Sequence, residues 1–331
     1  MTTTDVSQRE ALHAVVAEAV LAPSIHNTQP WRFMLGRDSL ELYTDSTRRL
    51  KVLDRTGRQM LLSAGCALFN ARAALAASGR AATIVRSPEP DDGGLVARIE
   101  LSSSAVVDDE LAALGGEIQR RQTNRRRFAD DVVPDELIAS LIGAAEAEGA
   151  MLIPVVRAED RQALARLSQR ADAQQLTSAA YRGELRAWTT DDRQRRDGVR
   201  AAVVPHVDGS AVDEVPIRDF DTRGTGQLPA DTRSTTRQCL LVLGTELDER
   251  ASWVRAGEAL ERVWLEITRA GFVASLFTQV IEEPGIRAQL REELRLGMYP
   301  HVVLRVGKAP VTAASMRRRV GDVLDERVPG R

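Results

Sequence analysis

Apolar residues recur along the first third of the chain at spacings that predict helices and strands in turn. Leu12, Val15 and Ala19 follow a helical period after a capping-box pattern at residues 7–10, and Pro23 predicts the end of this helix. Gly79 is expected just after a second, longer helix, where glycine is favoured. The pattern in this region predicts helices at about 7–22 and 57–78, and strands at 32–35, 40–43, 82–86 and 95–101.

The remainder of the chain also alternates between helical and strand patterns. Pro134 is expected at the first position of a helix, where its missing N–H is not needed. The tail, residues 308–331, is rich in arginine and has no clear period. One helix is predicted to begin near 111, and others to span 134–148, 253–270 and 285–295, with one or two helices at 160–187. Strands are predicted at 151–156, 238–243 and 301–306.

Two parts of the chain resemble each other, which indicates an internal duplication. Ala-Gly-Cys-Ala-Leu at 64–68 matches Ala-Gly-Glu-Ala-Leu at 256–260, and a glycine follows both at the same distance. Ala-Glu-Ala occurs before both, at 17–19 and 145–147. Two alanine-rich helices also look alike by chance, so this motif alone leaves both interpretations open.

The second copy is longer than the first, and much of the excess lies in residues 188–236. This segment is polar, is rich in Arg, Asp and Gly, and shows no clear period. A loop of this length in a compact domain is typical of an active-site lid or of a disordered segment. We therefore expect two halves, 1–110 and 111–331, with a lid insertion at about 188–236 in the second.

Composition and charge narrow the functional classes. The 331 residues carry 45 Lys and Arg against 47 Asp and Glu, a net charge of −2, which argues against a dedicated nucleic-acid-binding protein. Two distant cysteines without a CxxC motif, and four scattered histidines without HExxH, argue against a disulfide scaffold and a zinc site. We see neither a signal peptide nor an apolar run of about 18 residues, so we expect a cytoplasmic protein without a membrane span.

Three segments carry candidate chemistry. Residues 23–31, Pro-Ser-Ile-His-Asn-Thr-Gln-Pro-Trp, form a stiff polar loop that is able to hold a flat polar ring, although a helix-exit turn beside a core Trp gives the same pattern. Arginines and a threonine at 120–125 are able to converge on a phosphate, or else form a solvated basic face or an RNA-binding arm. The arginines at 317–319 suggest a second phosphate clamp or a solvated run.

Together these segments resemble the nitroreductase superfamily of FMN flavoproteins and, within it, the double-length Acg family of actinobacteria. The resemblance covers most of the chain except 188–236, and it implies an α+β, nitroreductase-like fold. It is carried by 23–31, by Arg-Gln-Thr-Asn-Arg at 121–125 with Phe128 and Pro-Asp-Glu-Leu at 134–137, by the helix 257–271 with Ser-Leu-Phe-Thr-Gln at 275–279, and by the strand 299–307 with its arginine tail.

The family resemblance also implies how a site is assembled. In the family that this chain resembles, the ordinary members are homodimers. Each of their FMN sites combines an Arg-x-Ser-x-Arg/Lys segment from one subunit with a Pro-Ser-x-x-Asn loop from the other. Here the first half has the loop and the second half has the arginine segment, so the resemblance implies a single-chain pseudo-dimer that holds one FMN. The implied site residues are Pro23, Ser24, Ile25, Asn27, Arg121, Thr123, Arg125, Leu276, Thr278, Gln279, Arg318 and Arg319.

Each residue takes its role from the same resemblance. Arg121 and either Arg318 or Arg319 would bind the phosphate, with Thr123 supplying a hydroxyl, and Arg125 would face the flavin N1/O2 edge. The 23–27 loop would line the ring, and the turn at 276–279 would present a backbone N–H near N5, most plausibly at Thr278. His26 is interpreted as structural and Cys66 as a core residue, and no general acid or base is required.

The expected function is an FMN-dependent oxidoreductase, NAD(P)H-linked or otherwise, that passes electrons through flavin N5 to a quinone-like or nitro-aromatic acceptor. The alternative is an FMN-sequestering or storage protein whose lid blocks NAD(P)H and substrate. The expected partners are small-molecule electron donors and acceptors, and not nucleic acid. A monomeric pseudo-dimer is expected, with a homodimer left open.

Overall fold

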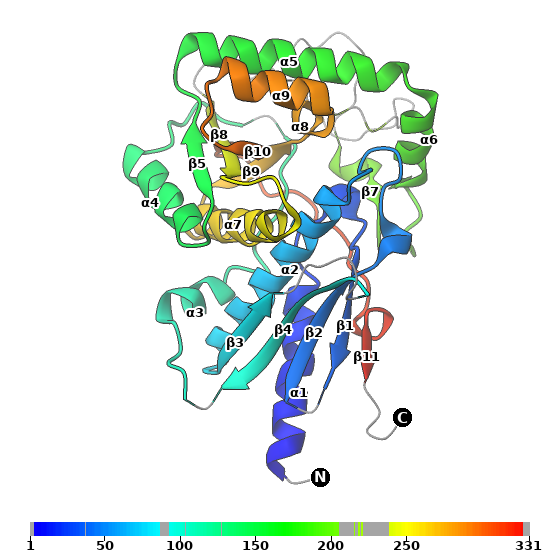
Figure 1. Ribbon diagram of the computed structural model, residues 1–331, viewed down its shortest axis with the longest axis vertical. Coiled ribbons are helices and arrows are strands. Elements are labelled where there is room, and N and C mark those ends of the chain that lie inside the picture. The colour runs from blue at the N-terminus through cyan, green and yellow to red at the C-terminus, as the bar shows by residue number, and fades with distance from the viewer. Residues whose placement is uncertain are drawn as a thin grey trace.

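A computed structural model gives the fold (Figure 1). Two sheets lie on opposite sides of the long helices α2 (Arg58–Ala77) and α7 (Arg250–Arg269). Both chain termini lie beside the first sheet. The structure describes residues 3–36, 38–86, 93–102, 104–126, 128–204, 215, 218, 220 and 238–326.

The first sheet contains the strands predicted in the first third of the chain and one strand from the tail. Its order is β11-β1-β2-β4-β3, and β11 pairs with β1 in parallel whereas the other pairs are antiparallel. The prediction of an irregular tail is therefore wrong at its end, because three residues are too few to show a strand period. The bounds are β1 Trp31–Leu35, β2 Ser39–Thr44, β3 Ala81–Arg86, β4 Leu95–Ser102 and β11 Leu324–Glu326.

The second sheet repeats the strand order of the first. Its order β5-β8-β10-β9 is antiparallel throughout and matches β1-β2-β4-β3 strand for strand. In each half a helix precedes the first strand, and a long helix connects the second strand to the third. The bounds are α1 Thr3–Ala19, α4 Asp135–Glu146, β5 Met151–Pro154, β8 Cys239–Thr245, β9 Val273–Phe277 and β10 Tyr299–Gly307.

The two long helices cross at the two glycines that the sequence repeat pairs. A Cβ atom on Gly65 would overlap the carbonyl oxygen of Val254 and lie 3.0 Å from the Cα atom of Gly257. A Cβ atom on Gly257 would in turn overlap the carbonyl oxygen of Leu62. The helix backbones therefore touch at this crossing, and only glycine fits at either position. By length and composition α2 is apolar enough to cross a membrane, but it is a mostly buried core helix here.

The remaining elements surround this centre. The region 160–187, predicted as one or two helices, forms two that divide at Ser178. The Ser178 hydroxyl caps the second helix by accepting from the N–H of Tyr181 (3.2 Å). Pro134 precedes α4 as its N-cap, one position earlier than predicted. The other bounds are α3 Asp109–Gly115, α5 Ala158–Thr177, α6 Ala179–Ala187, β6 Thr189–Thr190, β7 Val199–Arg200, α8 Gln279–Glu282 and α9 Pro284–Glu293, with single 3-10 turns at Ile25–Asn27, Ser46–Arg48, Ala201–Val203 and Val320–Asp322.

The predicted lid at 188–236 lies largely outside the described residues. The described part comprises residues 188–204, which form the small β6–β7 pair, and residues 215, 218 and 220. The boundary between the predicted halves, at 110/111, stays a prediction. One strand of the second range, β11, belongs to the sheet of the first.

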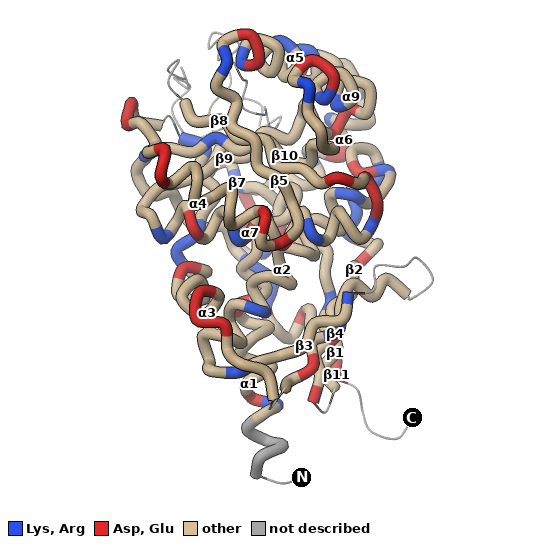
Figure 2. The backbone as a smooth tube through the Cα atoms, turned by 60° about the vertical axis from the view of Figure 1, so that its left-hand side comes forward, with Lys and Arg blue, Asp and Glu red and all other residues tan. Residues whose placement is uncertain are grey.

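Positive and negative side chains are interspersed over the described surface. Figure 2 shows both signs along α5 and α9, in keeping with the balanced composition. Several of these charges pair locally, as Arg157 does with Asp160 (2.7 Å). Such exposed pairs contribute little stability, so the buried charges described below matter more to the argument.

Candidate cofactor site

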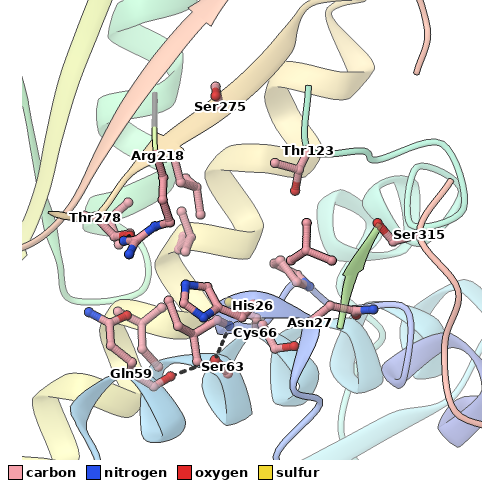
Figure 3. Close-up of a pocket in the computed structure, with 18 of the residues that line it drawn as sticks. His26, Asn27, Gln59, Ser63, Cys66, Thr123, Arg218, Ser275, Thr278 and Ser315 are labelled. Atoms are coloured by element: carbon pink, nitrogen blue, oxygen red, sulfur yellow. Dashed lines mark hydrogen bonds between the residues drawn. The ribbon is translucent and has the colours of Figure 1, made fainter. Parts of the chain in front are cut away.

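A cavity of about 100 Å³ lies between the loop after α1, helix α2 and the end of strand β9 (Figure 3). Nine of the twelve predicted site residues line it, and they come from three separate segments. These nine are Pro23, Ser24, Ile25, Asn27, Thr123, Arg125, Leu276, Thr278 and Gln279.

The loop that follows α1 has an unusual backbone. His26, Asn27 and Gln29 have φ values of 46°, 54° and 50°, in the left-handed region that residues other than glycine rarely adopt. The Ser24 hydroxyl holds the loop by accepting from the N–H of Gln29 (2.9 Å). Clustered strain of this kind is typical of functional sites.

The helix α2 supports the same loop from below. The Ser63 hydroxyl accepts from the N–H of Ile25 (3.2 Å) and donates to the Gln59 carbonyl (2.7 Å), as the dashed lines in Figure 3 show. Gln59, Ser63 and Cys66 all line the cavity. They follow a helical spacing on one face of an otherwise apolar helix. This polar stripe was the available sequence signal for a site, and we did not use it.

Side chains of the loop connect it to two distant segments. The Asn27 amide donates to the carbonyls of Gly198 (3.0 Å) and Met316 (3.1 Å). The Gln29 amide donates to the carbonyl of Arg196 (2.9 Å) and accepts from the N–H of Arg318 (2.7 Å). The loop therefore fixes both the start of the insertion and the tail against the cavity.

His26 was interpreted as structural from the sequence, but it lines the cavity. It is 7% exposed, and neither ring nitrogen has a hydrogen-bond partner among the described residues. Its ring meets the edge of Phe220 at 5.8 Å between centroids. Burial, together with the charges of Arg218 and Arg125, holds the pKa of His26 well below its usual value, so the ring is neutral near pH 7.

The segment 123–125 reaches the cavity because it pairs with strand β9. Thr123 forms an isolated parallel bridge with Ala274, whose carbonyl accepts from the N–H of Asn124 (2.9 Å). Arg125 then extends into the cavity, with its guanidinium 5.2 Å from the centroid of Phe220. Burial and the charge of Arg218 lower the pKa of Arg125 to about 10, and no carboxylate among the described residues pairs with it.

Arg121 does not line this cavity but a smaller one of about 70 Å³ beside it. The two cavities share Thr123, Ser315 and Arg317 as lining residues. Arg121 and Arg317 both donate to the carbonyl oxygen of Leu21, at 2.9 and 3.2 Å. Two buried guanidinium groups therefore meet at one end of the site. Burial and the charge of Arg121 lower the pKa of Arg317 to about 9.

Arg318 and Arg319 line neither cavity. The Arg318 guanidinium donates to the carbonyl of Asp322, and the Arg319 N–H donates to the Asp322 carboxylate (3.0 Å). The tail arginine that the fold brings to the site is Arg317. A run of consecutive arginines carries no signal for which one turns inward, so the sequence did not identify it.

The last wall of the cavity is the junction between β9 and α8. The predicted turn at 276–279 is in fact the end of a strand, a single residue at Thr278 and the start of a helix. Arg218, from the insertion, donates to the Thr278 hydroxyl (3.1 Å) and pairs with Glu282. Gln279 lines the cavity, although its amide donates to Asp172 on α5 (2.6 Å).

Comparison with known proteins gives relatives over nearly the whole chain. No family model matches it. The Mycobacterium tuberculosis protein named "Putative NAD(P)H nitroreductase Rv3131" is 36% identical over 325 residues, which cover 96% of this chain and 91% of that protein. The one named "Putative NAD(P)H nitroreductase acg" is 31% identical over 337 residues, covering 99% and 97%.

Solved structures with a similar arrangement are also nitroreductases. One from Bacteroides fragilis with bound FMN has a TM-score of 0.35 and 13% identity, over 62% of this chain and 98% of that chain. One from Desulfovibrio desulfuricans in complex with FMN has a TM-score of 0.37 and 14% identity, over 65% and 98%. The family assignment rests on the sequence relatives. By their identity and coverage, this chain belongs to the nitroreductase superfamily and, within it, to the Acg-like family.

Proposed function

We propose that this protein is an FMN-dependent oxidoreductase that passes electrons to a quinone-like or nitro-aromatic acceptor. The proposal rests on two features that lie next to each other in one site. The cavity lined by the loop 23–27 shares Thr123, Ser315 and Arg317 with a neighbouring cavity, where the guanidinium groups of Arg121 and Arg317 meet in an arrangement suited to a phosphate.

The polar atoms of the site fit FMN. Nη1 of Arg121 and Nε of Arg317 are buried and have no hydrogen-bond partner among the described residues. Each is a donor that a phosphate oxygen would satisfy. Both ring nitrogens of His26 and Oδ1 of Asn27 are equally unpaired at the wider end. Buried polar groups are normally paired, so this set indicates a polar ligand that completes them.

The chain's residues would bind and tune the cofactor rather than react themselves. Arg121 and Arg317 would hold the phosphate, and the loop 23–27 would hold one side of the ring. Arg125, which has no carboxylate partner among the described residues, places a positive charge where it would stabilise negative charge growing at the N1/O2 edge. When bound, FMN supplies hydride acceptance at N5 and onward electron transfer.

The relatives favour an oxidoreductase over a storage protein, since the named ones are NAD(P)H nitroreductases. We further propose that the chain is an internally duplicated pseudo-dimer with one complete site. The repeated strand order and the Gly65–Gly257 crossing support this. The same proposal includes that the protein acts as a monomer in the cytoplasm.

Stopped-flow spectroscopy of the protein loaded with FMN tests the function. We expect NADPH or NADH to bleach the absorbance near the flavin maximum, and a quinone to restore it. Dithionite is the control, since it reduces accessible flavin without a nicotinamide site. Flavin that responds to dithionite but to neither nicotinamide would contradict the NAD(P)H-linked activity. A colourless protein that rejects added FMN would overturn the whole proposal.

A further inference from the structure

We infer that Glu261 is the internal counter-ion of the phosphate subsite, and that binding of FMN adds one proton to this carboxylate. The inference rests on the proposed function, because it needs FMN to bind with its phosphate at Arg121 and Arg317. It concerns a residue that no sequence motif pointed to. Its consequence is an FMN affinity that falls as the pH rises above neutrality.

Glu261 lies on α7 directly behind the two arginines. Its Oε1 atom is 3.1 Å from Nε of Arg121, and both side chains are buried. The amide of Asn70 on α2, in the orientation that satisfies both its ends, donates to the same oxygen (3.0 Å). The other oxygen, Oε2, is buried without a hydrogen-bond partner among the described residues. One side of the carboxylate is therefore unsatisfied even when the arginines are in place.

The groups around Glu261 come from each element packed against it. Arg121 comes from the segment after α3, Arg317 from the tail, and Cys66 from α2. Burial and the charge of Glu261 raise the pKa of the Cys66 thiol, which stays protonated near neutrality. Glu18, at the end of α1, is held by the Gln119 amide (2.8 Å). Burial brings the pKa of Glu261 itself close to neutrality.

The charge balance gives the direction of the effect. Two guanidinium groups and one carboxylate leave this buried cluster with a single net positive charge. A phosphate monoester carries nearly two negative charges at neutral pH. With Glu261 ionised, the bound state would hold an excess negative charge in a dry site, and with Glu261 protonated the charges balance. The phosphate therefore favours the protonated form of Glu261.

Burial sets the pH range of the effect. It raises the pKa of Glu261 to about 7 in the ligand-free protein, against the lowering influence of Arg121 and Arg317. A nearby phosphate dianion raises this pKa further. Below the lower value Glu261 is already protonated and affinity is flat. Above it, binding takes up a proton, and the affinity falls by at most about tenfold per pH unit.

The test measures FMN affinity by quenching of flavin fluorescence between pH 6.5 and pH 8. We expect the affinity of the natural sequence to fall by about five- to tenfold over this range. Glu261→Gln should remove the fall and bind FMN more tightly at pH 8. Glu266→Gln is the matched control, since it removes a carboxylate paired with Arg269 (2.6 Å) from the same helix but outside the site. Riboflavin, which lacks the phosphate, should show no such dependence.

The outcomes separate this inference from the proposed function. Absence of FMN binding at every pH overturns both. FMN binding that is flat from pH 6.5 to pH 8, or an equal slope for riboflavin, overturns the inference alone. Should Glu261→Gln fail to fold, calorimetry of the natural sequence in two buffers of different ionisation enthalpy decides the question. Uptake of a proton at pH 7.5 supports the inference, and no uptake refutes it.

Discussion

The residues that follow Gly65 and Gly257, the two glycines of the α2–α7 crossing, lie in regions that differ in their charges. On one side Cys66, the residue after Gly65, lines the cavity described above. On the other side Glu258, the residue after Gly257, is buried in a network of ion pairs. The same helix crossing therefore supports a cavity on one side and a self-contained cluster on the other.

The network around Glu258 is complete without a ligand. Its carboxylate accepts from Arg72 (2.7 Å) and Arg86 (2.7 Å). Arg72 also pairs with Glu148 (2.6 Å), which accepts from Arg262 (3.0 Å). Each carboxylate has two guanidinium partners, and the positive charges in turn have carboxylates. The charges in this region are therefore balanced by the protein's own side chains.

The cavity side shows the opposite arrangement. Arg121 pairs with the Glu261 carboxylate, whose charge also acts on Arg317, and Arg125 has no carboxylate partner among the described residues. Because unpaired buried charge is costly, this side is expected to persist only where a ligand supplies the missing negative charge. The two regions therefore differ in how far carboxylates of the described residues balance the charge of their guanidinium groups. The predictions below test the difference between the cavity and the ion-pair network around Glu258, from the largest expected effect to the smallest.

The crossing itself should be the least tolerant feature. Gly257→Ala puts a methyl group onto the carbonyl of Leu62, and Gly65→Ala puts one onto that of Val254. We expect each to lower the free energy of unfolding by about 3 kcal/mol, because the helix backbones must separate. Chemical denaturation measures this. Gly143→Ala, in α4 with nothing within 4 Å, is the control and should be neutral or stabilising. Tolerance of alanine at either crossing glycine would contradict the packing.

The ion-pair network around Glu258 should contribute to stability but not to cofactor binding. Glu258→Ala leaves Arg72 and Arg86 without a shared partner, and we expect a loss of about 2–3 kcal/mol. The cost is below that of a fully buried pair because Arg86 reaches solvent. Denaturation and FMN titration on the same sample check the pair of expectations. A loss of FMN affinity without a loss of stability would show that this side also serves the ligand.

The sequence revealed the fold more fully than the site. The strongly periodic helices could be predicted because their period is a local property of the chain. The similarity between the motifs around Gly65 and Gly257 could be recognised because it lies in the sequence itself. The strand β11 was not, since its pairing with β1 depends on a partner almost 300 residues away. The choice of Arg317 over its two neighbours, and the roles of His26 and Glu261, depend on which way a side chain turns in the fold. No single-sequence pattern encodes that.

On the cavity side, the phosphate end should dominate binding. Arg121→Ala removes a charge-assisted bond, and we expect FMN affinity to fall by about 1.5–3 kcal/mol. The side chain also packs on Trp264, 4.9 Å from the ring centroid, so its stability is measured in parallel. Arg120→Ala removes the exposed neighbour, which pairs with Glu117, and should change nothing. Unchanged affinity in Arg121→Ala would show that the phosphate does not bind at this end of the site.

The ring end should give the smallest effect. His26→Phe keeps an aromatic ring of similar shape against Phe220 but removes two nitrogens that have no partner among the described residues. Because those nitrogens are unpaired until a ligand arrives, we expect no loss of stability in the ligand-free protein. FMN or acceptor affinity should fall by about 1 kcal/mol, the value of one neutral hydrogen bond. Since His26 is neutral near pH 7, this loss should not vary between pH 6.5 and pH 8, unlike the dependence assigned to Glu261. A destabilised ligand-free protein with unchanged affinities would return His26 to a structural role.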